Sequence, residues 1–398
     1  MAKVSRLVRL LPIALFAALL LVAAPAHAAK RQVPQGFFGT TVDGPMLAPD
    51  FPLEKEWGVM TGAGVESGRW AMHWGLMQPY RTMDEVPPAE RFRFTDEAGV
   101  PTDWTGSDLV IGNLAKRGFR VWPDITFAPA WAARHPGQGN SPPNGTADYV
   151  RFVQAAVKRY GPNGTFWTAN PSIPKRPIRD WQLWNEPNQA AFYWSDQPFA
   201  KDYVALLKAS RRAIKTLDPR ARIVLAATVG DISADRKSAP ALQSIYKAGG
   251  KGLFDVAAVH PFTYRVANMM LLLKAYRATL NKNGDRKKPL LITELAWPSA
   301  KGKVTKPYGY ETTESEQASR VREVMPLLVK QRSTLRLETV IWYTWSTTDT
   351  GTGSSFDYAG LRRWTGSKLV SKPAFSAFKS MALKYEGCKT KSSVLGGC

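Results

Sequence analysis

Cysteine and histidine are both scarce in this chain of 398 residues, with two cysteines and four histidines. The cysteines, Cys388 and Cys398, are too few for a disulfide-built scaffold, and neither residue type shows the spacing of a metal site. We therefore expect no metal centre. The two cysteines lie ten residues apart in the tail, residues 387–398, where we expect them to form a disulfide.

Several motifs of nucleotide and ester chemistry are missing. The sequence contains no phosphate-binding P-loop, no dinucleotide fingerprint and no Gly-x-Ser-x-Gly elbow. The basic residues are scattered and are not interleaved with aromatic residues, as they would be in a nucleic-acid-binding motif. These absences predict a protein that needs no cofactor and binds no nucleic acid.

Long hydrophobic runs are also missing, except near the N-terminus. Lys3, Arg6 and Arg9 precede an apolar run, Leu10–Ala24, and the small residues Ala26-His27-Ala28 follow it. This is the pattern of a secretory signal peptide. The run is shorter than the ~20 residues that a spanning helix needs, so we expect no stable membrane span. Residues 1–28 are predicted to be removed from a secreted protein; a retained anchor or lipid attachment is the alternative.

Acidic residues are outnumbered, with 32 Asp and Glu against 54 Lys and Arg, and the net charge is +22. Loss of residues 1–28 would lower the charge to +19, because that segment holds three basic and no acidic residues. Two interpretations remain open. The charge is either a solvated basic surface or an attraction to polyanions such as anionic cell-wall polymers.

Strand-like and helix-like segments alternate along the rest of the chain, which is typical of a parallel sheet built from βα units. The expected strands are Gly36–Val42, Ser67–Trp74, Phe119–Phe127, Arg179–Glu186, Ile223–Thr228, Val256–Phe262, Leu290–Leu295 and Val340–Trp345. Helical periodicity marks Asp148–Tyr160, Pro198–Leu217, Leu271–Leu280 and Glu314–Leu328. Eight strands with helices between them, and no linker or repeat, predict one (β/α)8 TIM barrel domain over residues 29–386.

Two of these strands end on a glutamate that a proline soon follows. The first carries Trp184-Asn185-Glu186-Pro187-Asn188, and the second carries Ile292-Thr293-Glu294 before Pro298. In such a barrel the catalytic groups lie at the C-terminal ends of the strands. Two carboxylates facing each other across a pocket are what glycoside hydrolysis needs.

With this pair of motifs, the chain resembles the retaining glycoside hydrolases of clan A, nearest to the family 39 and family 5 types. The resemblance implies hydrolysis of an oligo- or polysaccharide by a two-step displacement. Glu186 would be the general acid/base and Glu294 the nucleophile. We expect a monomer, and the pattern of residues 1–28 predicts that it acts outside the cell. A barrel that only binds carbohydrate, and a transglycosylase using the same two residues, are the alternatives.

The resemblance implies further site residues. Asn185 would bind the sugar 2-hydroxyl, Arg69 would hold the nucleophile, and His260 would line the site. A tyrosine commonly follows strand six in the clan; Phe262 takes the nearer position here, so we assign this role to Tyr264.

Tryptophan faces suit the apolar faces of sugar rings. By resemblance, Trp345 would form the floor of the sugar subsite. Further candidate platforms are Trp131, Trp194 and Trp297, and packing in the core is the alternative for each of the four.

Overall fold

The computed structural model describes residues 30–138, 140–189, 199–230 and 238–398. The predicted signal peptide and Trp194 lie outside the described residues. In the part of the chain that is described, no helix has both the length and the apolar character needed to cross a membrane.

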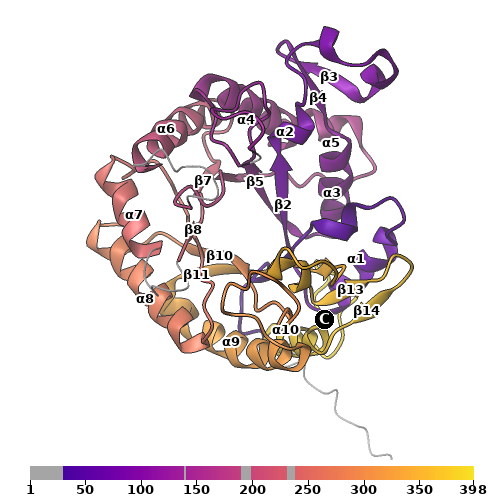
Figure 1. The fold of residues 1–398 in the computed structure, drawn as a ribbon, viewed down its shortest axis with the longest axis vertical. Coiled ribbons are helices and arrows are strands. Elements are labelled where there is room, and N and C mark those ends of the chain that lie inside the picture. The colour runs from indigo at the N-terminus through magenta and orange to yellow at the C-terminus, as the bar shows by residue number, and fades with distance from the viewer. Residues whose placement is uncertain (1–29, 139, 190–198, 231–237) are drawn as a thin grey trace, which may run out of the picture.

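Nine strands form one parallel sheet, in the order β7-β6-β5-β2-β1-β11-β10-β9-β8. They are β1 (Phe38–Thr41), β2 (Ser67–His73), β5 (Arg120–Thr126), β6 (Asp180–Leu183), β7 (Arg222–Leu225), β8 (Thr228–Val229), β9 (Ala257–His260), β10 (Leu290–Leu295) and β11 (Leu337–Trp342). The sheet is curled, and the helices surround it (Figure 1). Each predicted strand overlaps an observed one.

One predicted strand is divided in two. β7 pairs with β6, and β8 pairs with β9, so the two pieces form opposite ends of the sheet order. Val224 in β7 also forms a single parallel bridge with Val256, and the Leu225 amide donates to the Val256 carbonyl at 2.9 Å. At this bridge one end of the sheet order, β7, lies beside the start of β9, which is the neighbour of β8 at the other end.

Helices lie around the sheet and at its two ends, and each of them has buried side chains. They are α1 (Leu53–Gly62), α2 (Trp74–Met77), α3 (Thr105–Lys116), α4 (Thr146–Tyr160), α5 (Thr165–Ala169), α6 (Phe199–Leu217), α7 (Ser238–Lys247), α8 (Val266–Lys282), α9 (Glu314–Leu335) and α10 (Pro373–Glu386). The predicted helices are confirmed. In α4, the apolar side chains recur with the 3.6-residue period of a helix and are buried: Tyr149, Phe152, Val153, Ala156 and Val157. Reciprocal hydrogen bonds between Thr313 and Glu316 form a capping box that fixes the start of α9.

Additional elements decorate the end of the sheet where the strands finish. An antiparallel hairpin, β3 (Phe94–Glu97) and β4 (Val100–Asp103), turns through Ala98 and Gly99, which both have positive φ. This is the geometry of a tight two-residue hairpin turn. A small sheet contains β12 (Ser346–Thr347), β13 (Arg362–Trp364) and β14 (Leu369–Ser371). Short 3₁₀ helices span Gly44–Leu47, Met83–Glu85, Pro88–Arg93 and Ser355–Tyr358.

The C-terminal tail packs against the opposite end of the sheet, where the strands begin. Cys388 and Cys398 form the predicted disulfide, with their Cα atoms 5.1 Å apart. Between them, Lys391 is buried and pairs with Glu66 and with Glu386, the latter at 2.6 Å. The disulfide loop thus places a lysine between two buried carboxylates.

Candidate active site

A cavity of about 1090 Å³ opens where the strands of the large sheet end. Both predicted catalytic glutamates line it, together with Arg69, Asn185 and Asp124. These residues come from β2, β5, β10 and the turn after β6. The cavity is therefore built from strands far apart in the sequence, as the strand-end rule for barrels predicts.

The backbone turns sharply to bring Glu186 into this cavity. β6 ends at Leu183, and both Trp184 (φ 76°) and Glu186 (φ 43°) adopt the left-handed region. Residues other than glycine are uncommon there, and each costs on the order of 1–3 kcal/mol. Hydrogen bonds from the Glu186 amide to the Ala227 carbonyl (3.1 Å) and from the Gln189 amide to the Glu186 carbonyl (3.0 Å) hold the turn.

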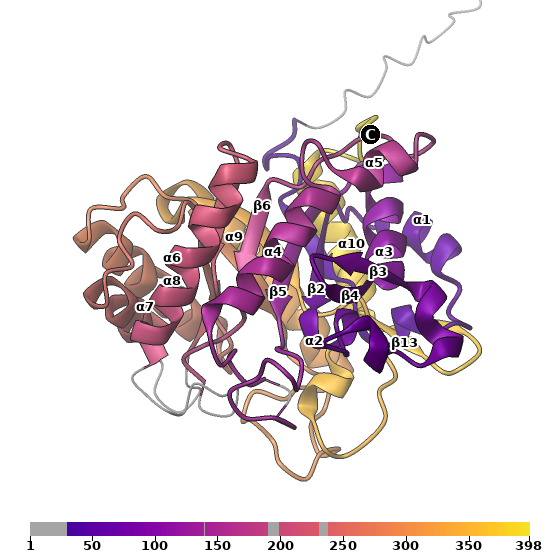
Figure 2. The ribbon, with the colours of Figure 1, turned by 90° about the horizontal axis from the view of Figure 1, so that it is seen from above.

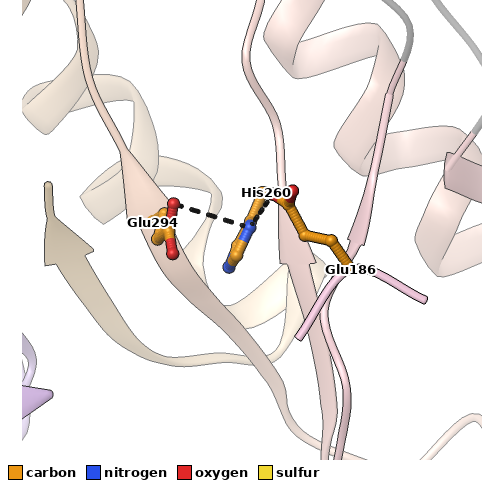
Figure 3. Close-up of side chains that lie close together, drawn as sticks. All are labelled: Glu186, His260 and Glu294. Atoms are coloured by element: carbon orange, nitrogen blue, oxygen red, sulfur yellow. Dashed lines mark hydrogen bonds and ion pairs between the residues drawn. The ribbon is translucent and has the colours of Figure 1, made fainter. Parts of the chain in front are cut away.

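His260, at the end of β9, lies between the two glutamates (Figure 3). Its Nδ1 is 2.5 Å from Glu186 Oε1 and 3.7 Å from Glu294 Oε2, and its Nε2 is 2.9 Å from Thr293 Oγ1. Burial lowers the pKa of His260 to about 4, so the ring is neutral near pH 7. In a neutral ring, Nδ1 can accept a hydrogen bond from the protonated carboxyl of Glu186 while the Nε2–H donates to Thr293 Oγ1.

The two carboxyl groups are in different electrostatic surroundings. Burial raises the pKa of Glu186 to about 7, although the Arg69 charge and a hydrogen bond from Gln189 oppose the rise. Burial also raises the pKa of Glu294, and there the charge of the Arg69 guanidinium and its hydrogen bond to Glu294 oppose the rise. Only Glu294 has a guanidinium in direct contact, which favours its ionised form.

That guanidinium belongs to Arg69, whose side chain is only 4% exposed. Nη1 donates to Glu294 Oε1 at 2.6 Å, and Nη2 donates to Asp124 Oδ2 at 2.6 Å and to Asn185 Oδ1 at 3.0 Å. One buried fork therefore fixes Glu294 and Asn185 together. Burial raises the pKa of Asp124 to about 7, with the charge of Arg69 opposing the rise.

Sequence reasoning missed a second group of cavity residues. Asp43 follows β1, and its carboxylate accepts hydrogen bonds from Thr344 Oγ1 and the Tyr343 hydroxyl. Both Asp43 and Tyr343 line the cavity. Their position directly after β1 and β11 is the signal that would have revealed them.

The structure corrects the assignment of the tyrosine. Tyr264 is 46% exposed, stacks near the Arg320 guanidinium and is not among the described cavity-lining residues. Tyr310 does line the cavity, is buried, and stacks on Phe262 with ring centroids 5.8 Å apart. Tyr264 does not reach the cavity because it lies in the connection between the end of β9 and the start of α8.

The tryptophans are also placed differently. Trp345 is fully buried and donates to Glu56 at 2.9 Å, Trp297 is fully buried and donates to the Tyr264 carbonyl, and Trp131 donates to the Gln78 carbonyl. None of these three belongs to the described lining of the cavity. β11 ends at Trp342, so Trp345 turns into the core instead of forming the floor of the site. The described lining presents other aromatic rings: Trp70, Phe127, Phe262, Tyr308, Tyr310, Tyr343 and Phe356.

Among the described residues, Glu186, His260 and Glu294 form a group whose atoms are close enough together to hold a metal ion. One ligand atom each from Glu186, His260 and Glu294 lies within 4.8 Å of the others. However, the His260 nitrogen in this group is already hydrogen-bonded to Glu186, and the Arg69 guanidinium 2.6 Å from Glu294 would repel a cation. The arrangement fits proton transfer and charge stabilisation better than metal binding.

No family model and no curated protein matches the sequence. Solved structures do match. A monomeric beta-xylosidase from Caulobacter crescentus has a TM-score of 0.60 at 16% identity, over 89% of this chain and 69% of the other. A family 39 glycoside hydrolase from Bacteroides cellulosilyticus has a TM-score of 0.59 at 18% identity, over 88% of this chain and 64% of the other. A family 51 alpha-L-arabinofuranosidase from Bifidobacterium longum has a TM-score of 0.57 at 13% identity, over 89% of this chain and 74% of the other.

The chain spans about two thirds of the length of the first two of these structures. At such low identity the likeness concerns the fold. The structural neighbours are glycoside hydrolases, as the two strand-end motifs predicted, and the chain has their fold.

Proposed function

We propose that this protein is a retaining glycoside hydrolase, with Glu186 as the general acid/base and Glu294 as the nucleophile. The observation that carries the proposal is the pairing of these carboxyl groups across the cavity, with one oxygen of each within 4.8 Å. Retaining enzymes place the two groups about 5–5.5 Å apart, whereas inverting enzymes need roughly 6.5–9.5 Å to admit a water.

The chemistry follows from the protonation states. Ionised Glu294, held by Arg69, attacks the anomeric carbon and forms a glycosyl ester as the glycosidic bond breaks. Glu186 gives its proton to the leaving oxygen, which its pKa of about 7 allows near neutral pH. In the second step Glu186 takes a proton from water, and that water displaces Glu294 from the sugar.

The proposed fold is the eight-stranded barrel of clan A, in which β7 and β8 are two parts of strand five. The bridge from Val224 to Val256 supports this interpretation, because it places β7 beside the start of β9, as in a barrel where strand five lies next to strand six. Glu186 then follows strand four and Glu294 ends strand seven, as in the family 39 and family 5 types that the sequence resembles.

The cavity favours a neutral or amino sugar at the cleaved bond. Six carboxyl groups are in its described lining: Asp43, Asp103, Asp124, Glu186, Glu294 and Asp357. Two guanidinium groups accompany them, and both are already paired: Arg69 with Asp124 and Glu294, and Arg93 with Asp103. A uronic acid would add another negative charge to this surface, which costs free energy in a partly desolvated site.

We also propose that the enzyme is secreted, on the sequence pattern of residues 1–28, and that it acts as a monomer. Its substrate would then be an extracellular oligo- or polysaccharide. Transglycosylation would use the same residues and differs only in the acceptor that displaces Glu294.

A panel of aryl glycosides tests the proposal. The wild-type protein should cleave at least one neutral or amino glycoside, and Glu294→Gln should abolish turnover of all of them. Glu186→Ala should spare substrates with good leaving groups, and azide should restore its second step as a glycosyl azide of retained configuration. Interchanged behaviour of the two variants would overturn the assignment, and an inactive wild-type protein would favour a binding function.

A further inference from the structure

A second hollow lies at the end of the sheet where the strands begin. Its volume is about 600 Å³, and its wall includes Gly36, Glu66, Phe119 and Arg120, which precede or start β1, β2 and β5. β5 rises about 3.3 Å per residue, so its seven residues separate the two ends of the sheet by about 20 Å. Figure 2 shows α5 and the C-terminus at this end, and α2 at the other. The hollow is therefore separate from the catalytic cavity.

Basic residues dominate its wall. Arg120, Lys175, Arg176 and Arg179 line the hollow, with Glu66 and Asp180 as the carboxylates. Part of this charge is already balanced within the fold.

Arg120 and Arg222 share two carboxylates, Asp180 and Glu338, in a closed group of two cations and two anions. Arg179 is paired with Asp218 at 2.8 Å. Each of these guanidinium groups is thus already paired with a carboxylate within the fold.

Two cations remain. In the described part of the chain, neither Lys175 nor Arg176 forms an ion pair, and the Nε of Arg176 is buried without a hydrogen-bond partner. A buried donor without an acceptor costs free energy, and a ligand that supplies the acceptor recovers this cost as binding free energy. Pro174 and Pro177 flank the pair and restrict its backbone, which lowers the entropy lost on binding.

We propose that this hollow is a binding site for the oxyanion groups of a polyanionic polymer. Guanidinium and ammonium groups bind phosphate and carboxylate through charge-assisted hydrogen bonds, and Arg176 adds the planar fork that suits both. The hollow is larger than one phosphate group and fits a short polymer segment. Bound there, the protein would be tethered by the end opposite its catalytic cavity, and the cavity would stay open to a neutral glycan.

Isothermal titration of the full chain with tripolyphosphate and with trigalacturonate tests this site directly. The two probes distinguish a phosphate source from a carboxylate source of the same chemistry. The test variant is Lys175→Ala/Arg176→Ala. The matched control is Lys201→Ala/Lys208→Ala, which removes the same charge from exposed positions on α6.

The wild-type protein and the control should bind one of the probes with a stoichiometry of one, and the test variant should bind it at least about tenfold more weakly, as expected for loss of a charge-assisted hydrogen bond. Equal weakening in test and control variants would show non-specific attraction and overturn the site. Absence of binding to both probes by the wild-type protein would overturn it as well. Because the readout is binding, failure of the proposed glycosidase activity would leave this result unaffected.

Discussion

At the scale of single residues, burial and one arginine separate the proposed roles of the two glutamates. Burial raises the pKa of both, and only Glu294 is in contact with Arg69. The acid and the nucleophile are thus distinguished by their neighbours. Glu186 contacts the neutral ring of His260, which carries no positive charge that would favour the ionised form of Glu186.

The pH dependence of kcat/KM should show this division. Glu186 is active when protonated, so activity should fall as the pH rises through about 7, where it loses its proton. In Glu186→Gln that alkaline limb should disappear, along with most of the activity on substrates with poor leaving groups. Profiles measured from pH 4 to pH 9 check this. An unchanged alkaline limb in the variant would assign the acid to another group.

Arg69 should matter to stability as well as to catalysis. Arg69→Ala leaves Asp124 and Glu294 buried without their cation, and breaking such a group costs roughly 3–5 kcal/mol. Since burial already raises the pKa of both carboxyls, they should bind protons in the folded variant. The free energy of unfolding should therefore drop more at pH 8 than at pH 5.

Urea denaturation at both pH values measures the difference. Arg69→Ala/Asp124→Asn is the control, and it should recover part of the loss at pH 8 because one buried charge is removed. A loss that is equal at the two pH values would show that the carboxyls do not respond to the arginine.

The tyrosine assignment has a matched pair of variants. Tyr310 lies in the cavity wall, whereas Tyr264 is half exposed outside the cavity. The pKa of Tyr310 is raised, chiefly by burial and by Tyr308, and the charges of Glu186 and Glu294 contribute to the rise. Tyr310→Phe should lower kcat by about tenfold or more, as loss of a hydroxyl in a desolvated site does, and Tyr264→Phe should leave it unchanged. The reverse result would restore the sequence-based assignment.

At the scale of elements, the sequence predicted the strands and the main helices because their apolar periods are strong. Glu186 and Glu294 could be located for the same reason, since strand ends are catalytic positions in this fold. The break between β7 and β8 could not be predicted, because Ala226 and Ala227 continue the apolar run. Trp345 was misplaced because β11 ends at Trp342, and side-chain direction beyond a strand end depends on loop packing.

The C-terminal tail, for which the sequence predicted only a disulfide, covers the end of the sheet where the strands begin. Lys391 is the buried cation between Glu66 and Glu386, and burial raises the pKa of Glu386 to about 7. Lys391→Ala should lower the free energy of unfolding by roughly 3–5 kcal/mol. Lys389→Ala, at an exposed position in the same disulfide loop, should change it by less than about 0.5 kcal/mol.

Denaturation curves of the two variants give both values. Similar curves for Lys391→Ala and the wild-type protein would mean that the tail contributes little to the fold. In that case its lysine would not be what holds the buried carboxylates.

At the scale of the whole molecule, the two hollows differ in charge. The net charge is +22, but the described wall of the cavity is rich in carboxyl groups, whereas basic residues outnumber acidic ones in the wall of the hollow at the other end. Salt should therefore weaken adsorption to anionic polymer, since the Debye length at physiological strength is about 8 Å. Activity on a small neutral glycoside should change little with salt. A steep decline of kcat/KM with salt on an acidic glycan alone would contradict a cavity selective for neutral sugars.

The central claim is that Glu294 forms a covalent bond to the sugar while Glu186 supplies the proton. The most direct measurement is mass spectrometry after incubation with the 2-deoxy-2-fluoro analogue of a cleaved glycoside, followed by peptide mapping. We expect one fluoroglycosyl group per chain, on the peptide that carries Glu294, and none in Glu294→Gln. An active enzyme that forms no adduct and releases sugar of inverted configuration would contradict it, as would an adduct on Glu186.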